Sequence, residues 1–358
     1  MTSTTAVRPQ ELTAAQLQRW RELLLTNDEL RSPYFHPEYV MAVAEVRDDV
    51  YVGVFEADGG EAFLPFQLGR FGVAGPVGGG FSDYQAVIAP AGVTVDVAAV
   101  VADLDLRLLD FDHQLATQTW FAPYARAHHT SPYLDLADGF EAYVAARKAA
   151  GSSRLSQFQR KGRKLGRERG ELRLVYSDAD ADMLDQVIAW KRAQCVRTRA
   201  TDFFAWDWTN GIVQRIHRTK TDGFAGILTA LYAGDDLVAA HFGIRTDRVL
   251  HWWFPTYDRD LGSYSPGGVM LTLLAERAAA EGIEMLDLGR GGDVGYKASF
   301  ASGAIPLLEG SVGPRSAVSV ARDLRRGGEY LLRDAPALEP ARSVARRARN
   351  RIRPTPTD

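Results

Sequence analysis

The feature that most constrains the fold is a run of three apolar segments in the back half of the chain. They are GFAGILTALYAG (223–234), DLVAAHFGIRTD (236–247) and VLHWWFPTYD (249–258), and short polar turns separate them. This pattern predicts a meander of three consecutive strands. Two helical segments precede the meander, and a helix, a strand, a short helical turn and a last strand follow it. The order predicts an α+β fold built on a mixed sheet.

The front half repeats this order in a weaker form. The spacing of apolar residues predicts a helix at 11–27, and alternation predicts two strands at 50–57 and 61–72. The segment AAVVADLDLRLLDF (98–111) has the pattern of a further helix. We therefore expect two similar folds in tandem.

Charge also divides the chain. Residues 1–146 contain 8 Lys and Arg against 20 Asp and Glu, a net charge of −12, whereas the other residues contain 34 against 25, a net charge of +9. This asymmetry indicates two units with different partners, and an anionic ligand is expected on the back half. The expected domains are residues 1–146 and 147–315, followed by a basic tail at 316–358.

The segment 147–173, which joins the halves, contains ten Lys and Arg and only two acids. Leu155, Phe158 and Leu165 predict a narrow apolar stripe on a helix whose other face is cationic and solvated. This helix either connects the domains or attracts phosphate groups of a substrate. The arginine-rich tail either keeps the chain soluble or contacts an acidic membrane surface or a nucleic acid.

Composition excludes several classes of protein. The chain has 358 residues, enough for two domains, and 46% of them are apolar, as in globular proteins. The single cysteine, Cys195, excludes an intramolecular disulfide and a cysteine-ligated zinc cluster, and we expect no metal. The first ten residues lack the apolar core of a signal peptide, and no apolar run reaches about 18 residues. The expected location is the cytoplasm.

The stretch SYSPGGVML follows the last strand of the meander and predicts the start of a helix. Ser265 is a good N-cap residue, and Pro266 suits the first helical position. Gly267 and Gly268 have no side chain that would keep an anion from the backbone, and the first N–H groups of a helix attract anions. The junction is therefore either a diphosphate-binding site or a plain helix start.

With these residues in view, the sequence resembles the GNAT-related acyltransferases of the CelD group, named for cellulose biosynthesis, and through them the FemAB aminoacyltransferases. In the back half, the resemblance rests on SPYLDLADGFEAY and the basic segment after it, on WFPTYDRDLGSYSPGGVMLTLL and on LDLGRGGDVGYKASF. In the front half, YFHPEYV, FLPFQL and SDYQAVIA match more loosely. The resemblance spans residues 15–313 and implies two tandem GNAT folds with an active cleft near their contact.

The resemblance also implies a reaction. An acyl group would pass from acyl-CoA, with acetyl-CoA the first choice, to an amine or hydroxyl of a sugar, amino sugar or small amine in polysaccharide or specialised metabolism. Ser265, Gly267 and Gly268 would receive the donor diphosphate, and Arg290 would also bind the donor. SYSPGG departs from the family pattern of arginine or glutamine, two residues, glycine, any residue and glycine. Because of this departure, aminoacyl-tRNA is a second candidate for the donor. A further alternative is that the chain is a tandem GNAT scaffold that catalyses no reaction.

Acyl transfer to an amine needs a neutral amine, a stabilised oxyanion and a protonated thiolate. Lys297 is expected to bind the oxyanion or a phosphate, and the resemblance also implies that it lies at the acyl-transfer site. Asp287 is expected to orient Lys297 or the incoming amine. His241 suits a base and Tyr257 suits a proton donor to the thiolate, but either is equally a packing residue.

Substrate-binding residues are expected in two places. Asp83 and Tyr84, in the stretch SDYQ, are expected to bind the acceptor, although Asp83 also suits a simple turn. Asp293 and Tyr296 belong to LDLGRGGDVGYK, where four glycines let the backbone approach a ligand. The alternative for this cluster is a buried ion pair that holds the loop.

Overall fold

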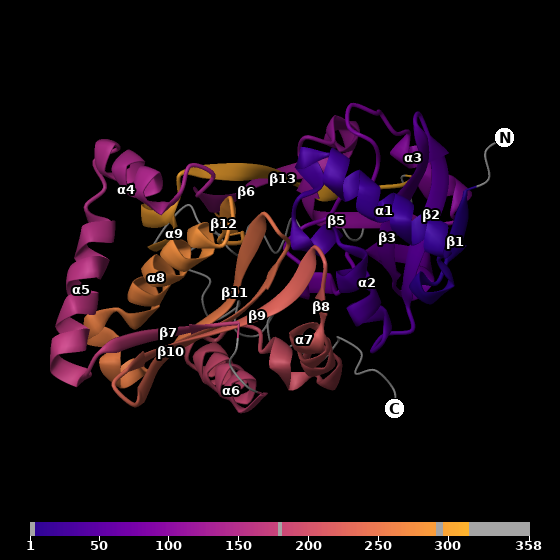
Figure 1. Cartoon of the computed structure of the whole chain (residues 1–358). Helices are drawn as coiled ribbons and strands as arrows, with labels where there is room; N and C mark the ends of the chain where they lie inside the picture. Colours follow the sequence, from indigo (N-terminus) through magenta and orange to yellow (C-terminus); the bar gives the residue numbers. More distant parts are fainter. Residues whose placement is uncertain (1–3, 178–180, 291–295, 315–358) are drawn as a thin grey trace, which may run out of the picture. The chain divides into compact units, whose positions relative to one another are not determined.

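The structure is a computed structural model and describes residues 4–177, 181–290 and 296–314 (Figure 1). Its α-helices are α1 (Ala14–Thr26), α2 (Pro37–Ala44), α3 (Val97–Asp103), α4 (Phe140–Ala149), α5 (Arg154–Arg169), α6 (Ala181–Thr198), α7 (Asp207–Arg218), α8 (Pro266–Ala280) and α9 (Tyr296–Phe300). Its strands are β1 (Thr5–Val7), β2 (Val50–Ala57), β3 (Gly60–Leu68), β4 (Val73–Gly75), β5 (Leu108–Leu115), β6 (Ala125–Asp135), β7 (Leu172–Tyr176), β8 (Lys220–Thr221), β9 (Phe224–Ala233), β10 (Asp236–Arg245), β11 (Val249–Tyr257), β12 (Met285–Asp287) and β13 (Gly303–Val312).

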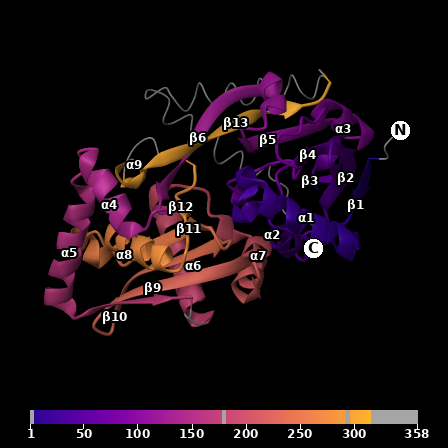
Figure 2. The same cartoon turned by 45° about the horizontal axis from the view of Figure 1, so that its top comes forward.

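One sheet runs through the described residues in the order β1-β2-β3-β4-β5-β13-β6-β12-β11-β10-β9-β7, and β8 pairs with β9. Strand β13, the last strand of the described residues, lies between β5 and β6 and is antiparallel to both (Figure 2). Strand β6, from the front half, pairs in turn with β12 of the back half. Strands from the two predicted halves therefore alternate at the middle of the sheet.

The predicted meander is confirmed, because β9, β10 and β11 pair antiparallel in this order. Both faces of these strands are buried. Phe242, Ile244 and Phe254 belong to a core that includes residues of α6 and α7. Leu250 and Trp252 belong to a second core that includes residues of α5 and α8. The meander thus forms the middle layer between two layers of helices.

The helix predicted at 98–111 is wrong in its second half. Helix α3 ends at Asp103, and β5 follows at Leu108–Leu115. Asp105, with φ 53°, lies in the turn between them. Strand β5 is buried on both faces and lacks the alternation of a half-exposed strand, so its periodicity cannot be told from that of a buried helix. Its pairing with β4 and β13 makes this segment a strand and not a helix.

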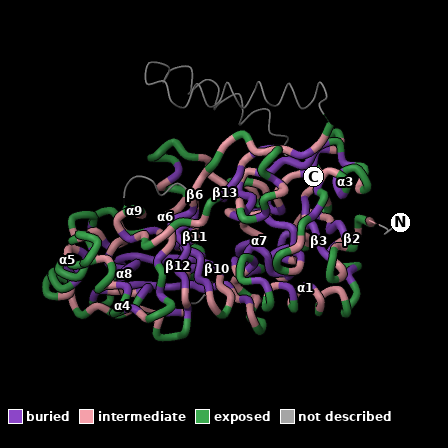
Figure 3. The backbone as a smooth tube through the Cα atoms, turned by 90° about the horizontal axis from the view of Figure 1, so that it is seen from above, coloured by how far each residue is buried: buried purple, intermediate pink, exposed green. Residues whose placement is uncertain are grey.

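The predicted basic helix is confirmed as α5. Leu155, Phe158 and Leu165 are buried, whereas its outer face is exposed (Figure 3). The helix packs along α8, where Gly162 lies so close that an added Cβ would meet Val269 at 3.2 Å. No helix among the described residues is both long enough and apolar enough to cross a bilayer.

The expected division into domains is not decided by this fold. Residues 1–312 form one compact unit, and the expected boundary at 146/147 falls within α4. The tail expected at 316–358 lies outside the described residues.

Candidate active site

His251 lies between two carboxylates that come from opposite halves of the sequence. It faces Asp287 across the parallel pair β11–β12, and its Nδ1 lies 3.1 Å from Asp287 Oδ2. Its Nε2 lies 3.0 Å from Oδ2 of Asp83, in the loop after the short 3₁₀ helix η5 (Gly79–Phe81). The side chains of His251 and Asp287 are each 1% exposed, and that of Asp83 is 28% exposed. The Asp83–His251–Asp287 row therefore runs from the interior toward solvent.

Asp287 is the buried anchor of this row. Ser131 Oγ donates a hydrogen bond to its Oδ1 at 2.8 Å, and the Gly289 N–H donates to the same oxygen at 2.9 Å. Because these donors and His251 surround the carboxylate, Asp287 has no oxygen open to a substrate. The predicted direct contact of Asp287 with an amine does not fit its burial.

The two carboxylates determine the charge of the histidine. Burial disfavours the imidazolium, but the charges and hydrogen bonds of Asp287 and Asp83 outweigh it and raise the pKa of His251 to about 9. Burial likewise opposes ionisation of Asp83, yet the hydrogen bond from His251 and the charges of His251, His113 and Lys297 lower the pKa of Asp83. At neutral pH, an imidazolium therefore holds a carboxylate whose outer side is open to solvent.

Gly289 makes this close approach sterically feasible. An ideal Cβ at this position would lie 2.6 Å from Asp83 Oδ2 and 3.2 Å from the ring of His251. Gly289 also has a φ of 70°, which L residues rarely adopt. Gly289 thus permits the contact between Asp83 and the back half.

Two lysines with lowered pKa values lie near the row. Burial lowers the pKa of Lys297, although the charges of Asp83 and Asp287 oppose this, and its Nζ lies 3.4 Å from Gly289 O and 3.3 Å from Arg290 O. Burial also lowers the pKa of Lys191 in α6 to about 8, with a further contribution from the charge of Lys297. The predicted Lys297 therefore joins the site, and Lys191 adds an amine that the sequence did not single out.

His113 extends the row on the solvent side. Its Nε2 lies 3.8 Å from Asp83 Oδ1, and its Nδ1 lies 2.9 Å from Asp112 Oδ1. Asp83 is thereby flanked by two histidines, one from β11 and one from β5. Neither histidine was among the residues predicted from the sequence.

His241, predicted as a base, lies elsewhere. It is 0% exposed and stacks on Trp252 with ring centroids 4.3 Å apart. Burial and the charge of His251 lower its pKa to about 3, so the ring is neutral at pH 7. Neither ring nitrogen has a hydrogen-bond partner among the described residues. Its burial does not fit the predicted role in proton transfer, because no substrate reaches the ring.

The other predicted site residues are spread over three places. Arg290 donates hydrogen bonds to Asp112 O at 3.0 Å and to Glu309 at 3.1 Å, so it ties the loop after β12 to β5 and β13. The Trp252 indole N–H donates to the hydroxyl of the exposed Tyr296 at 3.2 Å. Tyr84 is buried, and burial followed by the charge of Asp287 raises its pKa well above the ordinary value. Asp293 lies outside the described residues.

The junction before α8 forms the expected helix start, with Pro266 at its beginning. Ser265 is the N-cap residue, as expected, but it has a left-handed φ of 52° and its side chain caps no helix N–H. Instead, Lys161 Nζ of α5 donates to Ser265 Oγ at 2.6 Å. The ammonium group of Lys161, from the basic helix α5, therefore lies at the start of α8.

The two glycines of the junction have different surroundings. An added Cβ at Gly268 would lie 2.3 Å from the ring of Phe158, so this glycine serves the packing of α5 on α8. Its N–H donates to Ser265 O at 3.0 Å. At Gly267, an added Cβ would make an ordinary 3.5 Å contact with the exposed Tyr257. Gly267 and Tyr257 therefore lie side by side where a donor diphosphate was expected.

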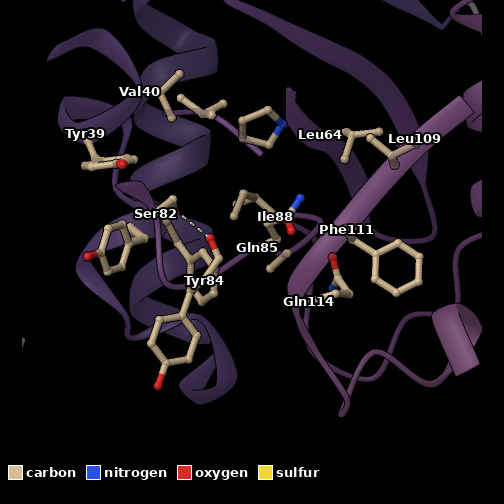
Figure 4. Close-up of a pocket in the computed structure, with 15 residues that line it drawn as sticks. Tyr39, Val40, Leu64, Ser82, Tyr84, Gln85, Ile88, Leu109, Phe111 and Gln114 are labelled. Atoms are coloured by element: carbon tan, nitrogen blue, oxygen red, sulfur yellow. Dashed lines mark hydrogen bonds between the residues drawn. The ribbon is translucent and has the colours of Figure 1, made fainter. Parts of the chain in front are cut away.

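A small cavity lies among residues that flank Asp83, lined in part by Tyr39, Ser82 and Tyr84 (Figure 4). Its volume is about 30 Å³, which holds a water molecule or two but no acceptor. No group of three or more His, Cys, Asp or Glu within the described ranges is arranged to hold a metal ion.

Residues 151–298 match the family model described as acetyltransferase (GNAT) domain. This segment contains α5, the meander, α8 and β12, so this part of the chain is a GNAT acyltransferase domain. A domain of this family implies acyl-CoA as its co-substrate. No curated protein matches the sequence.

Two solved structures have a similar fold. The C-terminal DUF2156 domain of a candidate lysylphosphatidylglycerol synthetase from Agrobacterium fabrum has a TM-score of 0.52 at 12% identity, covering 86% of this chain and 95% of that chain. FemX has a TM-score of 0.52 at 9% identity, covering 86% of this chain and 96% of that chain. At these identities the similarity shows a mixed α+β, GNAT-like fold.

Proposed function

We propose that the chain transfers an acyl group from acyl-CoA, with acetyl-CoA as the first choice, to an amine or hydroxyl of a sugar, amino sugar or small amine. The observation that carries this proposal is the contact between the acyltransferase domain and Asp83. The domain contributes His251 and Lys297, and the front half contributes a carboxylate that is open to solvent. The arrangement as two tandem GNAT-like folds, 1–146 and 147–315, and the placement in the CelD group belong to the same proposal.

The residues around the start of α8 fit the anionic end of acyl-CoA. Gly267 belongs to the first turn of the helix, where N–H groups have no acceptor within the helix. Lys161 brings a positive charge within hydrogen-bond distance of Ser265. When bound, acyl-CoA would supply a thioester carbonyl that an amine can attack. Arg290 is held at the β5 and β13 end of the site, so it has no part in this donor contact.

The acceptor would bind at Asp83. The lowered pKa of Asp83 keeps its carboxylate charged, so it can accept a hydrogen bond from a neutral amine or from a hydroxyl of the acceptor. His251, fixed by Asp287, holds Asp83 in one orientation. Asp83 takes up the proton that the nitrogen or oxygen loses as its bond to the acyl carbon forms. Tyr84, buried beside this loop, positions Asp83 and does not touch the acceptor.

Lys297 completes the proposed reaction, because it stabilises the negative charge that develops on the carbonyl oxygen. Tyr257 lies beside Gly267, at the diphosphate end of the donor, and six residues along β11 from His251. It is therefore about 20 Å from the acceptor end of the site, and the departing sulfur takes its proton from solvent. Tyr296 and Asp293 remain predicted acceptor contacts.

The test is thiol release from a series of acyl-CoA donors, from acetyl to long-chain, offered amino sugars and small amines. Asp83→Asn is expected to lower kcat/KM about 100-fold, which corresponds to loss of a charge-assisted contact and a proton acceptor. Asp138→Asn, at an exposed acid, is the matched control. Calorimetry that detects no binding of any acyl-CoA would contradict the proposal.

A tRNA-borne aminoacyl donor is the second candidate, because the outer face of α5 is cationic. Helix α5 contains seven Lys and Arg against one Glu. This donor predicts tRNA binding whose logarithm of affinity falls linearly with the logarithm of salt concentration.

A further inference from the structure

A surface groove lies between α5 and α8, apart from the Asp83–His251–Asp287 row. Its volume is about 650 Å³, within the range of small-molecule sites. Figure 1 shows the two helices side by side. The groove is lined by Gln159, Arg163, Arg167 and neighbouring residues of α5, by Val269, Thr272, Leu273 and Glu276 of α8, and by Glu171 and Leu172.

The floor of the groove is apolar and low. Gly162 and Gly166 of α5 have no side chains, and the apolar lining of the groove, which we call its floor, consists of Phe158, Leu172, Val269 and Leu273. Residues at 162 and 166 are one turn apart, and side chains there would fill the space between the helices. The floor suits a flat, weakly polar ring such as a nucleobase.

The α5 rim of the groove carries two unpaired cations. Arg163 and Arg167 are exposed, and neither forms an ion pair or hydrogen bond with another described residue. Their guanidinium groups are one turn apart on one face and can bind one phosphate together. Glu171 and Glu276 also line the groove, but neither forms an ion pair with Arg163 or Arg167 among the described residues.

We propose that this groove binds the 3′-phosphorylated adenosine of acyl-CoA, with the base on the apolar floor and the ribose 3′-phosphate on Arg163 and Arg167. This inference rests on the proposed function for its ligand. Lys161, which contacts Ser265 at the start of α8, directly precedes Gly162, which lines the groove. One helix therefore presents a cation to the expected diphosphate position and two cations to the 3′-phosphate.

The test compares CoA with dephospho-CoA, which lacks only the 3′-phosphate, by calorimetry on the full chain. The expected result is about tenfold or greater preference for CoA, the range of a charge-assisted contact. The double variant Arg163→Ala/Arg167→Ala is expected to bring this ratio close to one. The matched control, Arg154→Ala/Arg160→Ala, removes the same charge from exposed positions of the same helix outside the groove and keeps the preference.

A third ligand, adenosine 3′,5′-bisphosphate, separates the groove from the proposed function. If this bisphosphate binds through Arg163 and Arg167 while no acyl-CoA is turned over, the nucleotide site stands and the proposed function fails. If CoA and dephospho-CoA bind equally, or if both double variants have the same effect, the nucleotide site is wrong. The nucleotide site is also wrong if neither CoA nor the bisphosphate binds. It is wrong as well if the protein binds tRNA, both double variants weaken that binding equally, and CoA is not preferred over dephospho-CoA.

Discussion

The imidazole of His251 and the carboxylate of Asp287 face each other on neighbouring parallel strands, 3.1 Å apart and each 1% exposed. A charged pair this deep is stable only if every member keeps its partner. The loop residue Asp83 completes the pairing from the front half. Stability, ionisation and the proposed chemistry of the site therefore depend on the same histidine.

Replacement of this histidine is expected to destabilise the fold. His251→Gln leaves the buried Asp287 without its cation and should lower the free energy of unfolding by about 3–5 kcal/mol. Urea denaturation at pH 7 measures the loss. His128→Gln, at an exposed histidine of β6, should change stability little. Equal stability of both variants would show that the buried charge is absent.

Stability should also depend on pH in a defined direction. Because the folded-state pKa of His251 is about 9 and the unfolded value about 6.5, the contribution is complete below pH 6.5 and is lost as pH rises to 9. The loss amounts to about 3 kcal/mol. Subtracting the unfolding free energies of His251→Gln from those of the wild type at pH 6, 8 and 9.5 isolates this effect. A difference that grows with pH would refute the assignment of an imidazolium.

Lys297→Ala is expected to reduce turnover without loosening the fold. Removing a group that stabilises developing charge lowers kcat about 100- to 1,000-fold. The Nζ makes only two long contacts, 3.3 and 3.4 Å, to carbonyl oxygens, so the melting temperature should change little. Lys220→Ala, at an exposed lysine of β8, provides the control. Unchanged turnover would exclude Lys297 from the reaction.

Gly289→Ala should impair the site through sterics. The new Cβ would meet Asp83 at 2.6 Å, and the φ of 70° is unfavourable for alanine. We expect a loss of about 1–3 kcal/mol and a fall in kcat as Asp83 moves. Gly282→Ala has a similar φ of 84° but no atom within 4 Å, so it separates backbone strain from the clash. If both variants keep full activity, Asp83 does not need its present position.

Gly268→Ala should disturb the packing of α5 on α8, because the new Cβ would meet Phe158 at 2.3 Å. Overpacking of this kind lowers stability by about 1–3 kcal/mol. Gly267→Ala makes only an ordinary 3.5 Å contact with Tyr257, and alanine favours the helix, so this variant should be as stable as the wild type. Thermal unfolding of the two proteins provides the comparison. The opposite order of stability would contradict the assigned packing roles.

Much of the fold was predictable because local patterns dictate it. The meander at 223–258, the helix that begins at Pro266 and the basic helix α5 all carry the periodicity or the start signals of their elements. Strand β5 was misjudged because a strand buried on both faces has no alternation to detect. The insertion of β13 between β5 and β6 could not be predicted, because pairing between segments so distant in sequence produces no local sequence pattern.

The site was predictable only in part, for a related reason. Asp83, Asp287 and Lys297 were found from glycine-rich polar stretches that end strands. His251 stands in the apolar stretch VLHWWF, where its neighbours mark it as a core residue. Only the register that sets it opposite Asp287 distinguishes it from His241, and register is fixed by tertiary pairing.

The place of β13 in the sheet has a consequence for biosynthesis. A ribosome releases the front half long before Gly303–Val312 emerges, so β5 and β6 must wait with unpaired edges for their shared neighbour. Contacts between residues that are far apart in the sequence form slowly. The nascent chain therefore completes its central sheet only after Val312 has left the ribosome, and a chaperone that shields those edges until then would raise the yield of native protein.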